Sequence, residues 1–206
     1  MGNSLRIGWV LGWAVPVAWF KTKVEESFPT YKHTFIEPSK DAISHLIYHG
    51  PYDIIVGYSL GSLLLLNHKE DVNKLTKKVF LLSPILGFTR EMNLGGKIKL
   101  ADLKATKLRI KRNAQETLRG FYALADLTFS EAYLTSFDPN VLSDGLDMLE
   151  SMSITSELPQ SWMYLLGEKD ALLDSHVLKE KIPHLILIKE GTHAFDSLLK
   201  HLVQII

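Results

Sequence analysis

The chain has 206 residues, of which 46% are hydrophobic and 22% are charged. This composition is typical of one globular domain with a substantial core, and it excludes an intrinsically disordered chain. The 23 Lys and Arg residues balance the 23 Asp and Glu residues, so no overall charge attracts the protein to nucleic acid, and we expect no nucleic-acid partner. Cysteine is absent, which excludes disulfides, iron–sulfur clusters and thiolate zinc sites.

A charge-free segment runs from Ile7 to Phe20 near the start of the chain. It is shorter than the roughly 20 apolar residues of a membrane-spanning helix, and it contains Gly and Pro. A signal peptide with Arg6 as its charged region is one alternative. A buried strand followed by a loop explains the segment better, because a helical pattern comes next. We therefore expect a cytoplasmic protein without a membrane span.

Short apolar runs bounded by turn residues alternate with helical patterns. The runs cover residues 7–11, 34–36, 53–56, 79–82, 162–166 and 185–188. The helical patterns cover residues 16–28, 41–49, 60–75, 171–182 and 194–205. Continuous apolar runs are typical of strands buried on both faces. Their alternation with helices predicts an α/β fold with a mostly parallel sheet of about six strands and helices on both faces.

The alternation stops between Pro84 and Pro159, where the sequence becomes helical and polar. One helical face within 101–125 carries Leu103, Ile110, Ala114, Leu118, Phe121, Tyr122 and Ala125. A second helix is predicted over 139–150. We interpret residues 85–159 as a helical cap inserted after the fourth strand. Residues 1–84 and 160–206 then form the core of the same single domain.

Ser59 lies in the segment Gly57-Tyr58-Ser59-Leu60-Gly61, directly after the 53–56 run and at the start of a helical pattern. A serine on so sharp a strand-to-helix turn needs small neighbours, because its backbone is strained and the chain packs closely on both sides. The two glycines meet that need. The segment predicts a nucleophilic serine, and an ordinary glycine-flanked turn is the alternative.

A nucleophilic serine needs a base, and the base needs an acid that orients it. The 162–166 run leads into a loop that contains Asp170, and the 185–188 run leads into a loop that contains His193. Because both loops follow strands, as Ser59 does, we expect the three side chains at one edge of the sheet. The predicted catalytic residues are therefore Ser59, Asp170 and His193.

The acid and the base each have an alternative reading. Asp170 could instead cap a helix that begins at Ala171, and Asp174 is a competing acid one turn later. His193 could cap or pack at the start of the last helix. No other histidine follows a predicted strand of the sheet, which favours the catalytic reading.

The oxyanion hole is predicted from two backbone N–H groups. One belongs to Leu60, the residue after the proposed nucleophile, and the other to the loop Gly12-Trp13-Ala14 after the first strand. Trp13 is the expected second donor, and its indole would then line an acyl pocket. A plain core role for Trp13 is the alternative.

Metal and nucleotide chemistry find no support in the sequence. His45 and His49 are spaced four apart on a predicted helix, but no Glu lies between them as a zinc protease requires. No glycine-rich phosphate loop of the common types is present. We expect no metal and no other cofactor.

Several motifs carry a likeness to known proteins. They are Gly12-Trp13, Gly57-Tyr58-Ser59-Leu60-Gly61, Leu82-Ser83-Pro84, Thr117-Leu118-Arg119-Gly120-Phe121-Tyr122-Ala123-Leu124, Gly145-Leu146-Asp147-Met148-Leu149, the stretch from Gly167 to Asp170, and Gly191-Thr192-His193-Ala194-Phe195. On these residues the whole chain resembles the α/β-hydrolases. Its second half is similar to the pimeloyl-[acyl-carrier protein] methyl ester esterases of biotin synthesis. The chain departs from that family at Leu11-Gly12, where a His-Gly pair is usual.

The resemblance implies a serine carboxylesterase that cleaves a methyl ester on a carrier-bound acyl chain. It also implies that Phe121 lines the acyl channel, with Tyr122 beside it in the substrate site. Another carboxylesterase or a thioesterase would use the same triad, because the chemistry does not name the leaving group. A non-catalytic binding protein on this scaffold is the alternative from a different class.

Residues 97–119 hold eight cationic side chains and only two acidic ones, Asp102 and Glu116. A basic face above the active site would attract an acidic partner, such as an acyl carrier protein. Lys107, Arg109, Lys111 and Arg112 are the predicted docking residues. A solvated helix face is the alternative.

Overall fold

The computed structural model describes residues 4–206, so the first three residues of the predicted core lie outside it. Within residues 4–206 the sheet has six strands in the order β2-β1-β3-β4-β5-β6, and every neighbouring pair is parallel. The strands are β1 (Arg6–Val10), β2 (Lys32–Ile36), β3 (Ile54–Tyr58), β4 (Val79–Leu82), β5 (Met163–Gly167) and β6 (Ile186–Ile188). The predicted α/β fold with a parallel sheet of six strands is confirmed.

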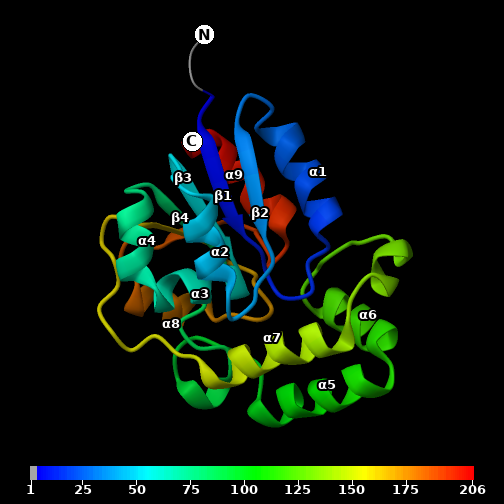
Figure 1. The fold of residues 1–206 in the computed structure, drawn as a ribbon. Helices are drawn as coiled ribbons and strands as arrows, with labels where there is room; N and C mark the ends of the chain where they lie inside the picture. The colour runs from blue at the N-terminus through cyan, green and yellow to red at the C-terminus, as the bar shows by residue number, and fades with distance from the viewer. Residues whose placement is uncertain (1–3) are drawn as a thin grey trace.

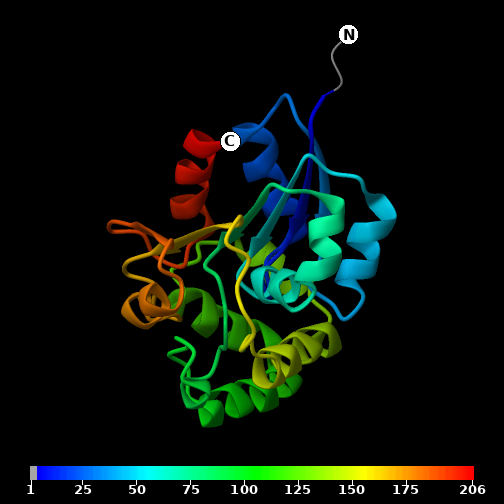
Figure 2. The same cartoon turned by 90° about the vertical axis from the view of Figure 1, so that its left-hand side faces the viewer.

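Helices pack on both faces of this sheet (Figures 1 and 2). One face is covered by α1 (Val17–Ser27) and α9 (Phe195–Ile205). The other is covered by α2 (Ala42–His49), α3 (Leu60–Asn67), α4 (Lys69–Leu75) and α8 (Ser175–Lys181). Alternate residues of each strand therefore enter different cores. In β3, for example, Ile54 and Val56 pack with α1 and α9, whereas Ile55 packs with α2 and α3.

The segment between β4 and β5 adds three helices beyond the carboxyl ends of the strands (Figure 1). They are α5 (Leu100–Arg112), α6 (Ala114–Leu124) and α7 (Pro139–Ser151), with short 3-10 turns η1 (Arg90–Met92) and η2 (Glu131–Thr135). Their apolar faces join the core on the α3 side of the sheet. We call these three helices with their connections the cap segment.

Three helix boundaries differ from those predicted. The 60–75 helix is interrupted at His68, and the 101–125 helix at Asn113, whose side chain accepts a hydrogen bond from the N–H of Glu116 and so begins α6. The helix expected from residue 171 begins at Ser175 instead. At the starts of α6 and α8 the side chains of Asn113 and Asp174 accept hydrogen bonds from backbone N–H groups and so cap the helix, whereas His68 makes no side-chain cap.

The charge-free segment 7–20 forms β1, the loop after it and the first turn of α1. Trp9 and Phe20 are fully buried and pack edge to face with ring centroids 5.7 Å apart. Among residues 4–206, no helix combines the length and the apolar character needed to cross a membrane.

Candidate active site

Ser59 is a one-residue turn between β3 and α3. Its backbone has φ 51° and ψ −115°, a conformation that residues other than glycine rarely adopt and that is found mainly at functional sites. Gly61 makes the turn possible, because a Cβ atom on residue 61 would lie 2.1 Å from the Val10 carbonyl oxygen. The turn therefore holds the Ser59 side chain at the carboxyl edge of the sheet. There the chain leaving β1 continues to β2 on one side, and the chain leaving β3 continues to β4 on the other.

The side chains of Ser59, His193 and Asp170 form a continuous hydrogen-bonded chain. His193 Nε2 lies 3.0 Å from Ser59 Oγ, and His193 Nδ1 lies 2.7 Å from Asp170 Oδ2. An ionised carboxylate can only accept, so Nδ1 carries the proton and Nε2 is left to accept from the serine hydroxyl. His193 and Asp170 are each 1% exposed and Ser59 is 8% exposed. The structure thus brings together the three residues that the sequence predicted as a triad.

Four donors surround the Asp170 carboxylate. Oδ1 accepts from the backbone N–H groups of Leu172 and Leu173, and Oδ2 accepts from His193 and from Ser83 Oγ. Burial by itself raises the pKa of the Asp170 carboxyl. The charge and hydrogen bond of His193, together with the two backbone N–H groups, outweigh that effect and hold the pKa below its ordinary value.

Asp174, the competing acid, lies outside this chain of hydrogen bonds. Its Oδ1 accepts from the backbone N–H groups of His176 and Val177 at 3.0 and 3.1 Å and so caps the start of α8. The helix-capping role that was an alternative for Asp170 thus belongs to Asp174.

Two buried hydroxyls that the sequence analysis did not identify hold the surrounding loops. Ser62 Oγ donates to the Ser59 carbonyl at 2.6 Å and accepts from the N–H of Ile85 at 3.0 Å. The Tyr58 hydroxyl donates to the His193 carbonyl at 2.8 Å. Burial raises the pKa of Tyr58 well above its ordinary value, and the Asp170 and Asp196 charges act in the same direction, so this hydroxyl stays a donor. Tyr58 lies within the Gly57–Gly61 motif and Ser62 directly follows it, but only the fold reveals what they touch.

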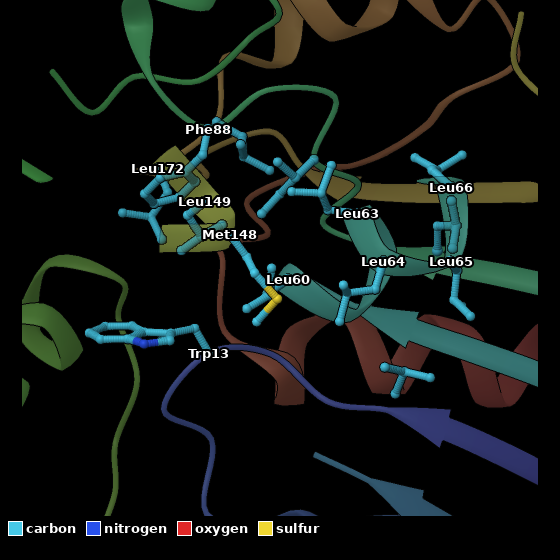
Figure 3. Close-up of a cluster of buried hydrophobic side chains, with 14 of the residues drawn as sticks. Trp13, Leu60, Leu63, Leu64, Leu65, Leu66, Phe88, Met148, Leu149 and Leu172 are labelled. Atoms are coloured by element: carbon cyan, nitrogen blue, oxygen red, sulfur yellow. The ribbon is translucent and has the colours of Figure 1, made fainter. Parts of the chain in front are cut away.

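Trp13 lies in the loop after β1 and packs under the cap segment. Its indole N–H donates to the Leu142 carbonyl at 2.8 Å, and its ring meets Phe121 edge to face at 4.7 Å. Trp13, Leu60 and Met148 belong to one buried hydrophobic cluster, which joins this loop to α3 and to α7 (Figure 3).

A cavity of about 490 Å³ lies inside the cap segment. Its lining is mostly apolar, with Asp102, Arg109 and Glu116 as the charged members. Trp13 and Phe121, two of the predicted substrate-binding residues, are among its lining residues, whereas Ser59, Asp170 and His193 are not. Tyr122 is not among the lining residues, because its hydroxyl is turned to the Ala14 carbonyl at 2.7 Å. Tyr122 therefore anchors the loop of Trp13 to α6.

Several cations of the basic segment 97–119 form ion pairs that the sequence did not predict. Lys107 pairs with Asp147, Lys104 with Glu150 at 3.5 Å, and Arg119 with Glu131 at 2.7 Å. Lys97 donates to the Asp170 carbonyl at 2.6 Å. The acidic partners come from α7 and η2, which spacing along one helix could not reveal. Within residues 4–206 no ion pair is formed by the remaining cations, Lys99, Arg109, Lys111 and Arg112.

Across the described part of the chain, no group of three or more His, Asp or Glu side chains is placed to hold a metal ion. His45 and His49, the spaced histidine pair, are exposed on α2. Neither residue lies in the hydrogen-bonded chain around Ser59.

No protein-family model matches this sequence, and no curated protein matches it. Solved structures do. An esterase from Exiguobacterium antarcticum matches with a TM-score of 0.76 at 13% identity, over 100% of this chain and 92% of the esterase. A hydrolase from Oleispira antarctica matches with a TM-score of 0.69 at 14% identity, over 98% of this chain and 92% of the hydrolase.

A bottromycin epimerase, solved in complex with bottromycin A2, matches with a TM-score of 0.69 at 11% identity, over 100% of this chain and 92% of that one. Identities this low establish the fold and nothing finer. The fold is the α/β-hydrolase fold, with a parallel sheet of six strands across residues 4–206 and helices on both faces. Because an epimerase shares it, the reaction must be argued from the site.

Proposed function

We propose that this protein is a serine hydrolase that cleaves carboxylic ester bonds. The observation that carries the proposal is the chain of hydrogen bonds from Ser59 through His193 to Asp170. These residue types in this order are the arrangement that activates a serine hydroxyl. The strained backbone of Ser59 supports the proposal, since such strain is retained where function requires it.

In the proposed reaction, Ser59 Oγ attacks the ester carbonyl carbon while His193 Nε2 takes the hydroxyl proton. Asp170 holds the imidazole in the required tautomer and stabilises the imidazolium. His193 then gives the proton to the departing alcohol, which leaves an acyl-serine. Water, deprotonated by His193, attacks that acyl-serine, and the carboxylic acid is released with Ser59 restored.

The oxyanion formed in each step needs donors at the carboxyl edge of the sheet. The backbone N–H groups of Leu60 and Trp13 are the proposed pair, because they follow Ser59 and the neighbouring strand β1. The contacts that Trp13 makes with Leu142 and Phe121 support this, since they fix the loop before substrate arrives.

The cavity in the cap segment is the proposed site for the acyl group. Its volume of about 490 Å³ falls within the range of small-molecule sites, and its lining is mainly apolar. Trp13 and Phe121 would contact the acyl chain, and Tyr122 would hold the Trp13 loop. An apolar acyl group of several carbons suits this lining.

The finer proposal is a methyl ester carried by an acyl carrier protein, as in biotin synthesis. Its support is the motif likeness in the second half of the chain and the cationic end of α5. Arg109, Lys111 and Arg112 are the proposed docking residues, because they form no ion pair within residues 4–206. Lys107 is withdrawn from that set, since it already pairs with Asp147.

A fluorophosphonate probe tests the class of reaction. The purified protein should gain one probe adduct, and peptide mapping should place it on Ser59. The matched control is Ser175→Ala, which removes another buried serine hydroxyl, one that donates to the Glu168 carbonyl at 3.3 Å and lies outside the proposed triad. Ser59→Ala should take no label, whereas Ser175→Ala should label like the parent.

Substrate tests then separate the alternatives. The parent protein is assayed on free acyl esters of increasing chain length, on the corresponding thioesters, and on methyl esters with and without an attached carrier protein. Turnover of esters supports the proposal, and faster turnover of thioesters would make the protein a thioesterase. Absence of both labelling and turnover would overturn the serine-hydrolase proposal and leave a non-hydrolytic role.

A further inference from the structure

Ser83 places a second polar side chain, besides that of His193, against the Asp170 carboxylate. It directly follows β4, it is fully buried, and its Oγ lies 3.0 Å from Asp170 Oδ2. The same oxygen accepts from His193 Nδ1 at 2.7 Å. Because an ionised carboxylate has no proton to give, the Ser83 hydroxyl must donate this hydrogen bond.

The backbone of Ser83 is held in a costly conformation. Its φ is 47°, in the left-handed region that few residues other than glycine adopt. The Ser83 N–H donates to the Leu165 carbonyl of β5 at 2.8 Å, and two residues later the N–H of Ile85 donates to Ser62 Oγ at 3.0 Å. Since Ser62 also holds the Ser59 carbonyl, the loop that carries Ser83 is tied to the turn that carries Ser59.

The four hydrogen bonds to Asp170 fill the acceptor sites of its carboxylate. Three of them come from the acid's own loop and from His193. The fourth comes from Ser83, which directly follows β4. It prevents the carboxylate from turning away from His193 and shares the negative charge on the oxygen that faces the imidazole.

We propose that Ser83 is a positioning residue of the triad, which fixes the Asp170 carboxylate toward His193 and weakens its hold on the imidazolium. The inference rests on the proposed serine-hydrolase function.

Loss of the hydroxyl has two expected effects. The value of kcat/KM falls by about tenfold to a hundredfold, as expected for a lost hydrogen bond to a buried charged group. The acid side of the kcat/KM profile also moves to higher pH. The unshared carboxylate charge attracts the imidazolium more strongly, so the inactive protonated form persists further up the pH scale.

Two variants separate the hydroxyl from the backbone. Ser83→Gly removes the hydroxyl and accepts φ 47° without strain, so it should fold at least as well as the parent. Ser83→Ala removes the hydroxyl and keeps the strain. Ser175→Ala is the control, because it removes a buried hydroxyl near the acid loop that does not touch Asp170. For each protein, kcat/KM on one free ester is measured across pH, with urea unfolding alongside.

In both Ser83 variants kcat/KM should fall, and the acid limb of its pH profile should move to higher pH. Ser175→Ala should keep the pH profile of the parent. It is overturned if Ser83→Gly keeps kcat/KM within about twofold of the parent, or if activity falls with an unshifted acid limb. Loss in Ser83→Ala alone would also overturn it, because the cause would then be strain.

A parent protein that cleaves no ester would end the proposed function and leave the contact to be tested separately. The resonance of the His193 Nδ1 proton in NMR spectra of the parent and of Ser83→Gly provides that test. An unchanged resonance would show that Ser83 does not act on the acid–imidazole pair. A shifted resonance would support the positioning role.

Discussion

Ser59 Oγ lies 3.0 Å from His193 Nε2 because the backbone of Ser59 is held at φ 51° and ψ −115°. A relaxed backbone at this turn would point the side chain elsewhere, so the strain is what aims the hydroxyl. Three contacts hold it in place: the Ser59 N–H donates to the Leu82 carbonyl at 2.9 Å, Ser62 holds the Ser59 carbonyl, and Gly61 lets α3 approach β1. The turn and the loops beside it therefore act as one unit.

Substitution of Ser59 should separate activity from stability. Ser59→Ala and Ser59→Gly both remove the proposed nucleophile, so ester hydrolysis should fall to background in both. The glycine variant should also be more stable than the alanine variant by about 1 kcal/mol, because only glycine adopts this conformation without strain. Urea unfolding measures the difference. Equal stabilities would argue that the turn is not strained, and retained activity would remove Ser59 from the mechanism.

Substitution of Asp170 should affect activity, whereas substitution of Asp174 should affect stability. Asp170→Asn should lower kcat by roughly 10⁴, because an amide favours the wrong imidazole tautomer. Asp174→Ala should keep kcat and lose about 1 kcal/mol of stability, because Asp174 caps α8. Steady-state kinetics and urea unfolding of both variants test this assignment. A large loss of kcat in the Asp174 variant would reverse it.

Asp170 should also make stability depend on pH at the acid end. Its pKa is lowered on folding from an ordinary value of 3.8, so the unfolded chain binds the proton more readily than the folded protein does. The contribution of this group is therefore complete above about pH 4 and is lost as the pH falls through the lower folded-state value. At pH values below the folded-state pKa of Asp170, the unfolding free energy of the parent should approach that of Asp170→Asn. A gap that stays constant as the pH falls would contradict the lowered pKa.

The sequence predicted the centre of the sheet well because β3 and β4 are apolar runs that are buried on both faces, whereas the edge strands β2 and β6 are only partly buried. It also placed Ser59, Asp170 and His193 at one edge, because parallel strands end on the same side. What it could not supply was contact between distant segments. Ser83 meets Asp170 because β4 lies beside β5, and that neighbour relation belongs to the strand order.

In the cap segment, too, the sequence could not predict contacts between separate helices. Its charges looked unpaired along one helix, yet Lys104 and Lys107 find Glu150 and Asp147 on α7. Pairing across helices depends on how α5 packs against α7, and periodicity within a single helix carries no information about that packing. The break at Asn113 was foreseeable in principle, since asparagine three residues before glutamate is a capping pattern.

The unpaired cations of α5 give a test of carrier docking. Replacing Lys111 and Arg112 with Glu should weaken turnover of a carrier-linked ester, because an acidic partner would then be repelled. Arg109 is kept, because it lines the proposed acyl cavity. Turnover of a free ester should barely change. In the parent, turnover of the carrier-linked ester should also fall with added salt, which screens exposed charges over about 8–10 Å. Equal loss on both substrates would point to damage of the cap segment, and no loss on either would end the docking proposal.

Two glycines in the cap segment form a matched pair for testing the role of Trp13. A Cβ atom on Gly145 in α7 would lie 2.3 Å from Trp13 Cδ1, whereas a Cβ atom on Gly120 in α6 would meet nothing within 4 Å. Alanine is the better helix former at both positions by about 1 kcal/mol. Gly120→Ala should therefore gain stability. Gly145→Ala should lose about 1–3 kcal/mol instead, because Trp13 or α7 must move.

The same displacement should reduce activity in only one of the two variants. Trp13 is 4% exposed and is fixed by Leu142 and Phe121, so a shifted indole carries its loop with it. If the Trp13 N–H is an oxyanion donor, kcat should fall by about tenfold or more in Gly145→Ala. It should change far less in Gly120→Ala, which adds a methyl group to the cavity lining but places it within 4 Å of no other group. Urea unfolding and ester kinetics measured on both proteins give the comparison. If Gly145→Ala gains stability as Gly120→Ala does, the Trp13 indole can move aside without cost. Full activity in Gly145→Ala would remove Trp13 from the oxyanion hole.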